Sequence, residues 1–436
     1  IKTEEMEKLP EGWKRVRLGE VLGYEQPTNY IVETESYDER FGIPVLTPGK
    51  TFVLGYTNEK EGIFKDIPVV IFDDFTTESR YINFPFKVKS SALKILKMRD
   101  NRNNLYFVYN TMQILNFKPG SEHKRFWISE YSKLEIPLPP LPEQQKIAEI
   151  LETVDSAIEN TDAIIEKYKR IKQGLMQDLL TRGIVENYEL GIMNYGSELR
   201  KHESGIMNDE LGVGSHESEI GNWELRDERK HKFKDSPLGR IPEEWEVVSL
   251  GEVAFITMGQ SPSSSLINKD EQGLPFLQGN AEFTNKHPNP INWIEKPLKI
   301  ANKDSILISV RAPVGALNLA NTQYCIGRGL ASIRVNNNLV DNHFLWYSIH
   351  FLINELVKLG QGSTFGAISS NELKALEIPL PPLPEQRRIA SILSQVDEVI
   401  EKEQKYKEKL ERIKRGLMED LLTGRIRVGL ELGIMN

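Results

Sequence analysis

Two long stretches of this chain place apolar residues at alternating spacings of four and three, which is the pattern of a coiled-coil helix. A helix lying flat on a globular domain would show a wider apolar stripe. The pattern predicts two helices of about 39 residues, each roughly 58 Å long. The apolar seam of the first stretch consists of Ile147, Leu151, Val154, Ile158, Ile165, Tyr168, Leu175 and Leu179. That of the second consists of Ile389, Leu393, Val396, Ile400, Leu410, Leu417 and Leu421.

Each predicted helix follows a nearly identical proline-rich block. The block LEIPLPPLPEQ begins at Leu134 and again at Leu376, and the two copies stay in register without a gap to Thr181 and Thr423. Proline disfavours helix at its own position and at the preceding one, so each helix should start at PEQ. Such a long gapless copy indicates two related half-units in one chain.

The segments that precede the two blocks also correspond. LPEGWKRVRLGEV from Leu9 matches IPEEWEVVSLGEV from Ile241. Each segment then carries a strand-like apolar run, PVVIF at 68–72 and SILISV at 305–310, followed by a short aromatic helix candidate, LYFVYNTMQ at 105–113 and HFLWYSIHFL at 343–352. We therefore predict an α+β fold with two globular mixed α/β domains separated by two long helices.

These patterns also set the predicted domain boundaries. The chain divides into a first globular domain (1–135), a first helix (136–182), a polar connector (183–240), a second globular domain (241–377), a second helix (378–424) and a C-terminal tail (425–436). The connector has too little apolar surface to fold as a domain, and its repeated GIMN motif is either part of a linker or a docking point. Its length permits parallel or antiparallel helices.

Composition narrows the classes of function. The 436 residues carry a formal net charge of −8, much of it in the connector, which is permissive toward DNA without pointing to it. No run of about 18 apolar residues occurs and the first residues are charged, so we expect a cytoplasmic protein. The single cysteine, Cys325, lies in an apolar run, and neither CxxC nor HExxH occurs. We therefore expect no metal site.

The motifs that suggest catalysis are incomplete. TPGKT at Thr47 imitates the end of a phosphate-binding loop, but Pro44 stands where that loop needs glycine. Asp73, Asp74 and Glu78 could be imagined as a nuclease cluster, but no lysine follows at a suitable spacing and solvated loop carboxylates explain them better. We expect no catalytic residue in this chain.

Taken together, these motifs resemble those of the DNA specificity subunits of type I restriction-modification systems, known as HsdS. The resemblance covers nearly the whole length. It rests on the paired LEIPLPPLPEQ blocks with their helices, on the LPEGW and IPEEW segments, and on SILISVRAPVGALN, CIGRGLASIR and GSTFGAISSNEL in the second half.

The resemblance implies two target-recognition domains, each reading one half of an interrupted asymmetric DNA site, and two antiparallel helices that space them. It further implies that this non-catalytic chain docks two modification (methyltransferase) subunits and that two restriction subunits complete the complex. S-adenosylmethionine would then bind the modification subunit, and ATP and magnesium the restriction subunit. The residues agree, because the adenine methyltransferase motif Asn/Asp-Pro-Pro-Tyr/Phe is missing from the sequence.

Base reading needs side chains with paired donors and acceptors on loops that reach a groove. The candidates in the first domain are Lys50, Thr51, Thr76, Thr77, Arg80, Lys87, Lys89 and Lys94. Those in the second domain are Gln260, Ser261, Ser263, Ser264, Gln278, Asn280, Arg311, Arg328 and Gln361. Lysines on a solvated face and ordinary turn residues are the competing interpretation.

Two other functions fit the same patterns. One is a coiled-coil assembly scaffold without DNA reading, because IPLPPLP resembles a polyproline ligand. The other is a specificity chain that serves a stand-alone methyltransferase without a restriction subunit.

Overall fold

The computed structural model describes residues 9–48, 51–117, 125–186, 223–360 and 367–429. The chain folds into two compact units. Unit 1 comprises residues 1–164 and 403–436, and unit 2 comprises residues 165–402. Each unit therefore contains one globular domain, the start of one long helix and the end of the other.

The globular part of unit 1 contains two sheets of three or more strands. The larger has the order β2 (Leu22–Glu25), β8 (Leu93–Met98), β5 (Val69–Asp73) and β6 (Ser79–Ile82), with all neighbours antiparallel. The smaller has the order β4 (Val53–Thr57), β3 (Ile43–Leu46) and β7 (Lys87–Val88), in which β3 and β7 run parallel. The remaining elements are α1 (Leu18–Val21), η2 (Pro27–Tyr30), α2 (Leu105–Gln113), α3 (Phe126–Ser129) and η3 (Tyr131–Lys133).

Unit 2 repeats this strand order with additions. Its four-stranded sheet has the order β15 (Ala254–Met258), β23 (Leu330–Val335), β20 (Ile306–Ser309) and β21 (Leu317–Leu319). Its second sheet has the order β16 (Ile267–Asn268), β18 (Asn292–Ile294), β17 (Leu274–Leu277), β22 (Tyr324–Ile326) and β19 (Ile300–Ala301). The parallel pair β17 and β22 matches β3 and β7 of unit 1. The helical elements are α6 (Leu250–Val253), η4 (Ser264–Leu266), α7 (Asn342–Phe351), α8 (Ile353–Gly360) and α9 (Ser370–Lys374).

Both proline-rich blocks form strands before their helices. In unit 1, β9 (Glu135–Leu138) pairs antiparallel with β1 (Lys14–Arg17). In unit 2, β24 (Glu377–Leu380) pairs in the same way with β14 (Glu246–Ser249). Proline can occupy these positions because each is a two-stranded sheet, in which one edge of the strand needs no hydrogen-bond donor. The segment at the start of each half-unit thus forms a strand that pairs with the strand of the proline-rich block.

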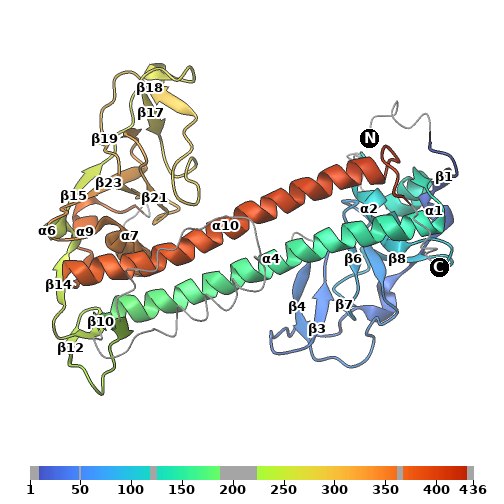
Figure 1. Cartoon of the computed structure of the whole chain (residues 1–436), viewed down its shortest axis with the longest axis horizontal. Coiled ribbons are helices and arrows are strands. Elements are labelled where there is room, and N and C mark those ends of the chain that lie inside the picture. Colours follow the sequence, from blue (N-terminus) through green and yellow to red (C-terminus); the bar gives the residue numbers. More distant parts are fainter. Residues whose placement is uncertain (1–8, 49–50, 118–124, 187–222, 361–366, 430–436) are drawn as a thin grey trace, which may run out of the picture. The chain divides into compact units, whose positions relative to one another are not determined.

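The two long helices are α4 (Leu141–Thr181) and α10 (Leu383–Leu421). Each begins one residue before the predicted PEQ start, because proline is tolerated in the first helical turn, where its missing N–H has no partner to lose. In unit 1 the first part of α4 lies beside the last part of α10, and in unit 2 the reverse holds (Figure 1). The helices are antiparallel in each unit, as the resemblance implied.

Ion pairs record the register between the helices. Lys414 pairs with Asp155 and Lys407 with Asp162 in unit 1, at 2.5 and 2.6 Å between nitrogen and oxygen. Lys172 pairs with Asp397 in unit 2 at 2.6 Å. In each pair the two residue numbers add to the same value, so one antiparallel register holds in both units.

The predicted seam residues face inward, although not only toward the other helix. Val154, Ile158 and Leu417 are partly buried, and the other twelve are buried. Ile147 and Leu151 belong to the unit 1 core together with Trp127 and Tyr131 of the globular domain. The seam therefore also anchors the domain to the helices.

Part of the predicted connector is folded. Of residues 183–240, those described form β10 (Ile184–Glu186) paired with β11 (Trp223–Leu225), and β12 (Phe233–Ser236) paired with β13 (Gly239–Pro242). Ile184 is 1% exposed and Arg226 is 3% exposed. A few apolar side chains and one buried ion pair hold these residues on unit 2, and the boundaries of the connector stay a prediction. The GIMN motifs at Gly191, Gly205 and Gly433 lie outside the described residues.

Candidate nucleic-acid interface and domain junctions

Three loops of unit 2 meet at Ser261. The Ser261 hydroxyl oxygen accepts hydrogen bonds from the Gln278 side-chain amide at 2.8 Å and from the Arg328 backbone N–H at 3.2 Å. Ser261 follows β15, Gln278 follows β17, and Arg328 lies in the turn between β22 and β23. Three residues from separate sequence motifs are thus brought together where the two larger sheets of unit 2 join.

Glycines allow this close approach. A Cβ atom on Gly259 would lie 2.1 Å from the Gly327 carbonyl oxygen, and one on Gly327 would lie 2.9 Å from the Gln278 carbonyl oxygen. The Gly327 N–H donates to the Leu277 carbonyl oxygen at 2.7 Å. Backbones can pack this tightly only without side chains, so the glycines hold the polar side chains of neighbouring loops at one edge.

The other candidates of unit 2 lie near the same edge or on adjoining loops. Arg311 is the second residue after β20, and the N–H of the preceding Val310 donates to the Gly329 carbonyl oxygen at 2.9 Å. The side chains of Gln260, Ser263, Ser264, Gln278, Arg311 and Arg328 are exposed, and that of Asn280 is partly exposed. Gln361 lies outside the described residues.

The equivalent edge of unit 1 is built on a tight turn between β5 and β6. Asp73 accepts hydrogen bonds from the Phe75 N–H at 2.9 Å and from the Thr76 hydroxyl at 2.7 Å. Thr77 adopts a φ of 65°, a left-handed conformation that costs a β-branched residue some strain. The carboxylate of Asp73 therefore holds this turn in place as a hydrogen-bond acceptor.

Two further candidates of unit 1 lie beside this turn. The Arg80 guanidinium is exposed and lies 4.6 Å from the centre of the Phe52 ring. Thr51 is exposed next to Phe52, and Lys50 lies outside the described residues. Pro48, Phe52, Asp73, Glu78 and Arg80 line a shallow pocket at this point, together with Ile71 and Leu93.

The lysine candidates of unit 1 need correction. Lys94 is 0% exposed and its ammonium lies 3.4 Å from Asp74, so burial lowers the pKa of Lys94 while Asp74 opposes that shift. Lys87 is 3% exposed and pairs with Glu59. Both are interior residues with acidic partners, which disagrees with their predicted place at a DNA groove. Lys89 is partly exposed and pairs with Glu35, which leaves it at the surface.

Sequence reasoning missed the polar residues that join the domains to the helices. Glu143 and Glu385 occupy the same position in the two proline-rich blocks, and both are buried. Glu143 accepts from the Trp13 indole N–H at 3.1 Å, and Glu385 accepts from the Trp245 indole N–H at 3.2 Å. The sequence did contain a signal for these contacts, because the glutamate of PEQ and the tryptophan of LPEGW and IPEEW recur in both halves.

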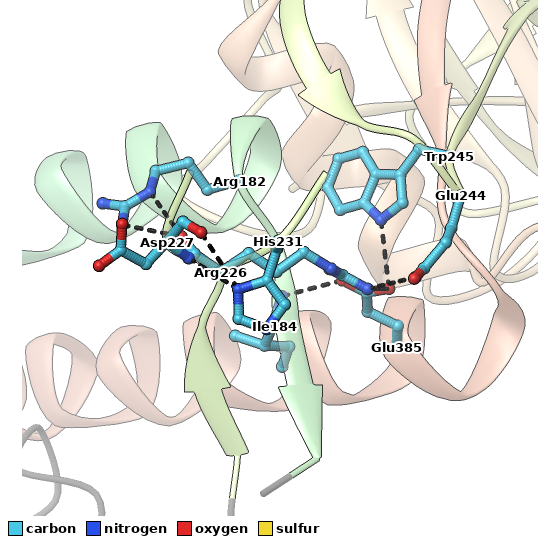
Figure 2. Close-up of polar contacts among 8 residues, drawn as sticks. All are labelled: Arg182, Ile184, Arg226, Asp227, His231, Glu244, Trp245 and Glu385. Atoms are coloured by element: carbon cyan, nitrogen blue, oxygen red, sulfur yellow. Dashed lines mark hydrogen bonds and ion pairs between the residues drawn. The ribbon is translucent and has the colours of Figure 1, made fainter. Parts of the chain in front are cut away.

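An arginine completes each of these junctions. Arg427 of the C-terminal tail donates to Glu143 at 2.8 Å, and Arg226 donates to Glu385 at 3.0 Å in a contact drawn in Figure 2. Glu385 also accepts at 2.9 Å from the N–H of Ile184, the third residue after α4. The segment that follows each long helix therefore docks on the start of the other one within the same unit.

A glutamine next to each glutamate fixes the aromatic helix of the domain. The side-chain oxygen of Gln144 accepts from the Asn104 N–H, and that of Gln386 accepts from the Asp341 N–H, both at 2.8 Å. Asn104 and Asp341 are the N-caps of α2 and α7, respectively. Each globular domain is thus hydrogen-bonded to the first turn of its long helix.

The described residues contain no group of three or more His, Cys, Asp or Glu side chains arranged to hold a metal ion. Within the same residues, no helix is long and apolar enough to cross a membrane. Cys325 is buried at 0% exposure in β22.

Comparison with known proteins gives a family. The family model described as "Type I restriction modification DNA specificity domain" matches residues 10–170 and again residues 242–412. The two matches fall on the two repeated halves, each including a globular domain and most of its helix.

Individual relatives match over nearly the whole chain. A putative type I restriction enzyme MjaX specificity subunit from Methanocaldococcus jannaschii is 35% identical, covering 98% of this chain and 97% of the relative. The EcoR124I/EcoR124II specificity subunit from Escherichia coli is 29% identical, with 90% and 89% covered. A crystal structure of a type I S subunit from M. genitalium has a TM-score of 0.61 at 16% identity, covering 95% of this chain and 98% of that one, which supports the fold.

Proposed function

The chain belongs to the family of type I restriction-modification DNA specificity subunits, and we propose that each of its two globular domains reads one half of a bipartite, asymmetric DNA site. The observation that carries this proposal is the repeated strand order with different loops. Both units place a parallel strand pair beside a four-stranded antiparallel sheet, while the loops at the shared edge differ in residues and length. Two domains with the same sheets and different loops suit a DNA site whose two halves differ in sequence.

Within unit 2 we propose that Gln260, Ser261, Gln278, Arg311 and Arg328 form the reading edge, with Ser263, Ser264 and Asn280 on adjoining loops. The Arg328 guanidinium carries two donors that suit the guanine edge in a major groove, and the Gln278 amide carries one donor and one acceptor that suit the adenine edge. Their backbones are fixed by the glycine contacts, which reduces the entropy lost on binding.

Within unit 1 we propose a smaller set. Thr51, Thr76 and Thr77 lie on exposed or partly exposed loops at the equivalent edge, Arg80 is exposed on β6, and in this proposal Lys89 contacts the phosphate backbone. Lys87 and Lys94 are left out because they are buried and paired. The contribution of Lys50 and Gln361 stays a prediction from the sequence.

We further propose that α4 and α10 set the distance between the half-sites and that the repeated block and helices dock the other subunits. By this proposal the chain is a non-catalytic part of an adenine-specific methyltransferase complex with two modification subunits and two restriction subunits. The methyl donor S-adenosylmethionine belongs to the modification subunit, and ATP and magnesium belong to the restriction subunit. We propose the domain boundaries expected from the sequence, with short strands at both ends of the connector.

The assembly-scaffold alternative loses its main support in the structure. The IPL residues of both blocks lie in strands β9 and β24, and Ile136 and Ile378 are fully buried. A polyproline ligand must present its residues to a partner's aromatic groove, and these residues are already packed. The second alternative is a specificity chain that serves a stand-alone methyltransferase. The genes beside this one test it, because a neighbouring gene for an ATP-driven translocase would contradict it.

Methylation mapping tests the proposal directly. The complex of this chain with its modification subunit should methylate one interrupted motif, and exchange of residues 254–375 for those of another family member should change one half of that motif only. Methylation without any bipartite motif, or a change in both halves after the exchange, would overturn the proposal.

A further inference from the structure

A tyrosine of each globular domain joins an aspartate of one long helix and a lysine of the other. In unit 2 the Tyr347 hydroxyl donates to Asp397 at 2.7 Å, and the Lys172 ammonium lies 2.6 Å from the same carboxylate. In unit 1, Tyr106 donates to Asp155, which also pairs with Lys414. We call these two sets the Tyr–Asp–Lys triads.

The aspartates and lysines of the triads are copies of each other, but the tyrosines are not. Asp155 and Asp397 occupy the same position in the repeated block, as do Lys172 and Lys414. Tyr106 is the second residue after the N-cap of α2, whereas Tyr347 is the sixth residue after the N-cap of α7. The two domains differ in sequence, and their tyrosines thus contact equivalent carboxylates from different turns of the aromatic helices.

The environment of the tyrosines favours a fixed contact. Burial and the neighbouring aspartate raise the pKa of both Tyr106 and Tyr347, so each phenol keeps its proton and donates it at neutral pH. The Lys172 ammonium also lies 5.3 Å from the centre of the Tyr347 ring, which adds a cation–π contact. One carboxylate therefore ties three elements of the unit together.

The second ion pair between the helices of unit 1 lacks this connection to a domain. Lys407 donates to Asp162 at 2.6 Å, and the positions equivalent to these two residues in the repeat are Ile165 and Gln404. This pair joins α4 to α10 without a tyrosine. It therefore offers a matched control for the loss of one polar contact between the helices.

We propose that the Tyr–Asp–Lys triads position the recognition domains on the paired helices and thereby restrict the spacer length that the protein accepts between its half-sites. This inference rests on the proposed reading of a bipartite site. The residues are positioning residues, because they act through the orientation of the domain and touch no base.

The physical reason is rotational as well as translational. One added base pair shifts a half-site by about 3.4 Å and turns it by about 35° around the duplex axis. A domain held by its β-strand pair, the first turn of its helix and the apolar contacts around Ile147 and Leu151 can still turn about this one end of the coil to follow such a change. A further contact to both helices, one or more turns along the coil, removes that freedom.

The test compares binding to duplexes in which the two mapped half-sites are separated by the natural spacer or by one base pair more or less. The protein is the full chain in complex with its modification subunit. The variant carries Tyr106→Phe and Tyr347→Phe, which keep the buried rings and the Asp–Lys pairs. The control carries Asp162→Asn, and each protein is first shown to fold by its thermal unfolding curve.

We expect the selectivity for the natural spacer to fall roughly tenfold in the tyrosine variant, as the loss of hydrogen bonds to charged groups suggests, with the half-site sequences unchanged. The Asp162→Asn control should keep the selectivity of the unchanged chain. Equal selectivity in all three proteins would overturn the triad proposal and leave the proposed function intact. Failure of the unchanged chain to prefer any bipartite site would instead overturn the proposed function.

Discussion

Arg226 and Glu385 form a buried ion pair although they lie 159 positions apart in the chain. Their side chains are 4% and 5% exposed, and the two groups make a bidentate contact. Arg427 and Glu143 form the corresponding pair in unit 1, where the arginine side chain is 46% exposed. The same glutamate position of the repeat is thus neutralised by arginines that come from unrelated positions.

Loss of the buried arginine should destabilise unit 2. Arg226→Met removes the arginine that contacts Glu385 in Figure 2. The buried carboxylate then keeps two neutral donors, the Ile184 N–H and the Trp245 indole N–H. Breaking one partner of a buried pair costs about 3–5 kcal/mol, so we expect the free energy of unfolding to fall by about that amount. Urea titration followed by tryptophan fluorescence measures it, since Trp245 contacts the same carboxylate.

Arg427→Met is the matched control for this change. The Arg427 side chain is half exposed, so solvent screens this pair more than the buried pair of unit 2, and the loss should be clearly smaller. Equal losses in the two variants would show that burial does not govern the strength of these pairs.

The triad tyrosines should make the protein sensitive to alkali. Burial and aspartate raise the pKa of Tyr106 and Tyr347 in the folded protein, while an unfolded tyrosine ionises near pH 10. The stabilisation is complete below about pH 10 and is lost above it, because only the unfolded chain then releases the proton. Each group contributes a slope of at most about 1.4 kcal/mol per pH unit.

Urea unfolding at a series of pH values from about 9 to about 12 checks this expectation. The unchanged chain should lose stability more steeply than the Tyr106→Phe, Tyr347→Phe variant over that range. Other buried tyrosines, such as Tyr131, whose pKa burial raises to about 12, remain in both proteins and cancel in the comparison. Parallel curves would mean that the two phenols titrate alike in the folded and unfolded chains.

A single change at the unit 2 edge should affect one half-site only. Arg328→Ala removes an exposed guanidinium but keeps the backbone N–H that donates to Ser261. If Arg328 contacts a base, discrimination at one position should weaken by about 1–3 kcal/mol, which degenerate-duplex selection measures position by position. Lys234→Ala, an exposed residue on β12, is the control and should leave the motif unchanged. Relaxation spread evenly over both halves would place Arg328 outside the reading edge.

The sequence was sufficient to predict the two long helices and the two half-units, because these parts of the chain are repeated. The period of the seam residues predicted both helices, and the gapless copy around PEQ predicted two half-units, which the structure and the family match confirm. The strand at 305–310 and the aromatic helix from residue 343 were also found where apolar patterns placed them. Patterns of burial are local in sequence, so one chain is enough to read them.

Long-range polar contacts were beyond the same reasoning. Lys94 looked like a surface lysine in a basic stretch, but its partner Asp74 lies on a neighbouring loop that only the sheet register brings close. Arg226 was assigned to a connector because its local composition is polar. The meeting of Ser261, Gln278 and Arg328 depends on the parallel pairing of β17 and β22, which no local pattern encodes.

The helix register sharpens the prediction that the coil sets the spacer. An insertion in α4 alone would keep either the Asp155–Lys414 pair or the Lys172–Asp397 pair in register with the rest of the coil, but not both. A heptad inserted into α4 after residue 163 together with one inserted into α10 after residue 405 keeps both pairs and the seam. Seven residues add about 10.5 Å at 1.5 Å per residue, which corresponds to about three base pairs.

Methylation mapping of the doubly extended chain should therefore show the original half-sites with a spacer longer by about three base pairs. The rotation of about 35° per base pair must also be met, so the DNA or the domains must absorb roughly 105° of twist, and we expect weaker binding than for the unchanged chain. A heptad in α4 alone is the informative comparison, because it lengthens one helix while misaligning the ion pairs, and it should lose site-specific methylation. An unchanged spacer in the doubly extended chain would mean that the helices hold the domains together without measuring the distance between the half-sites.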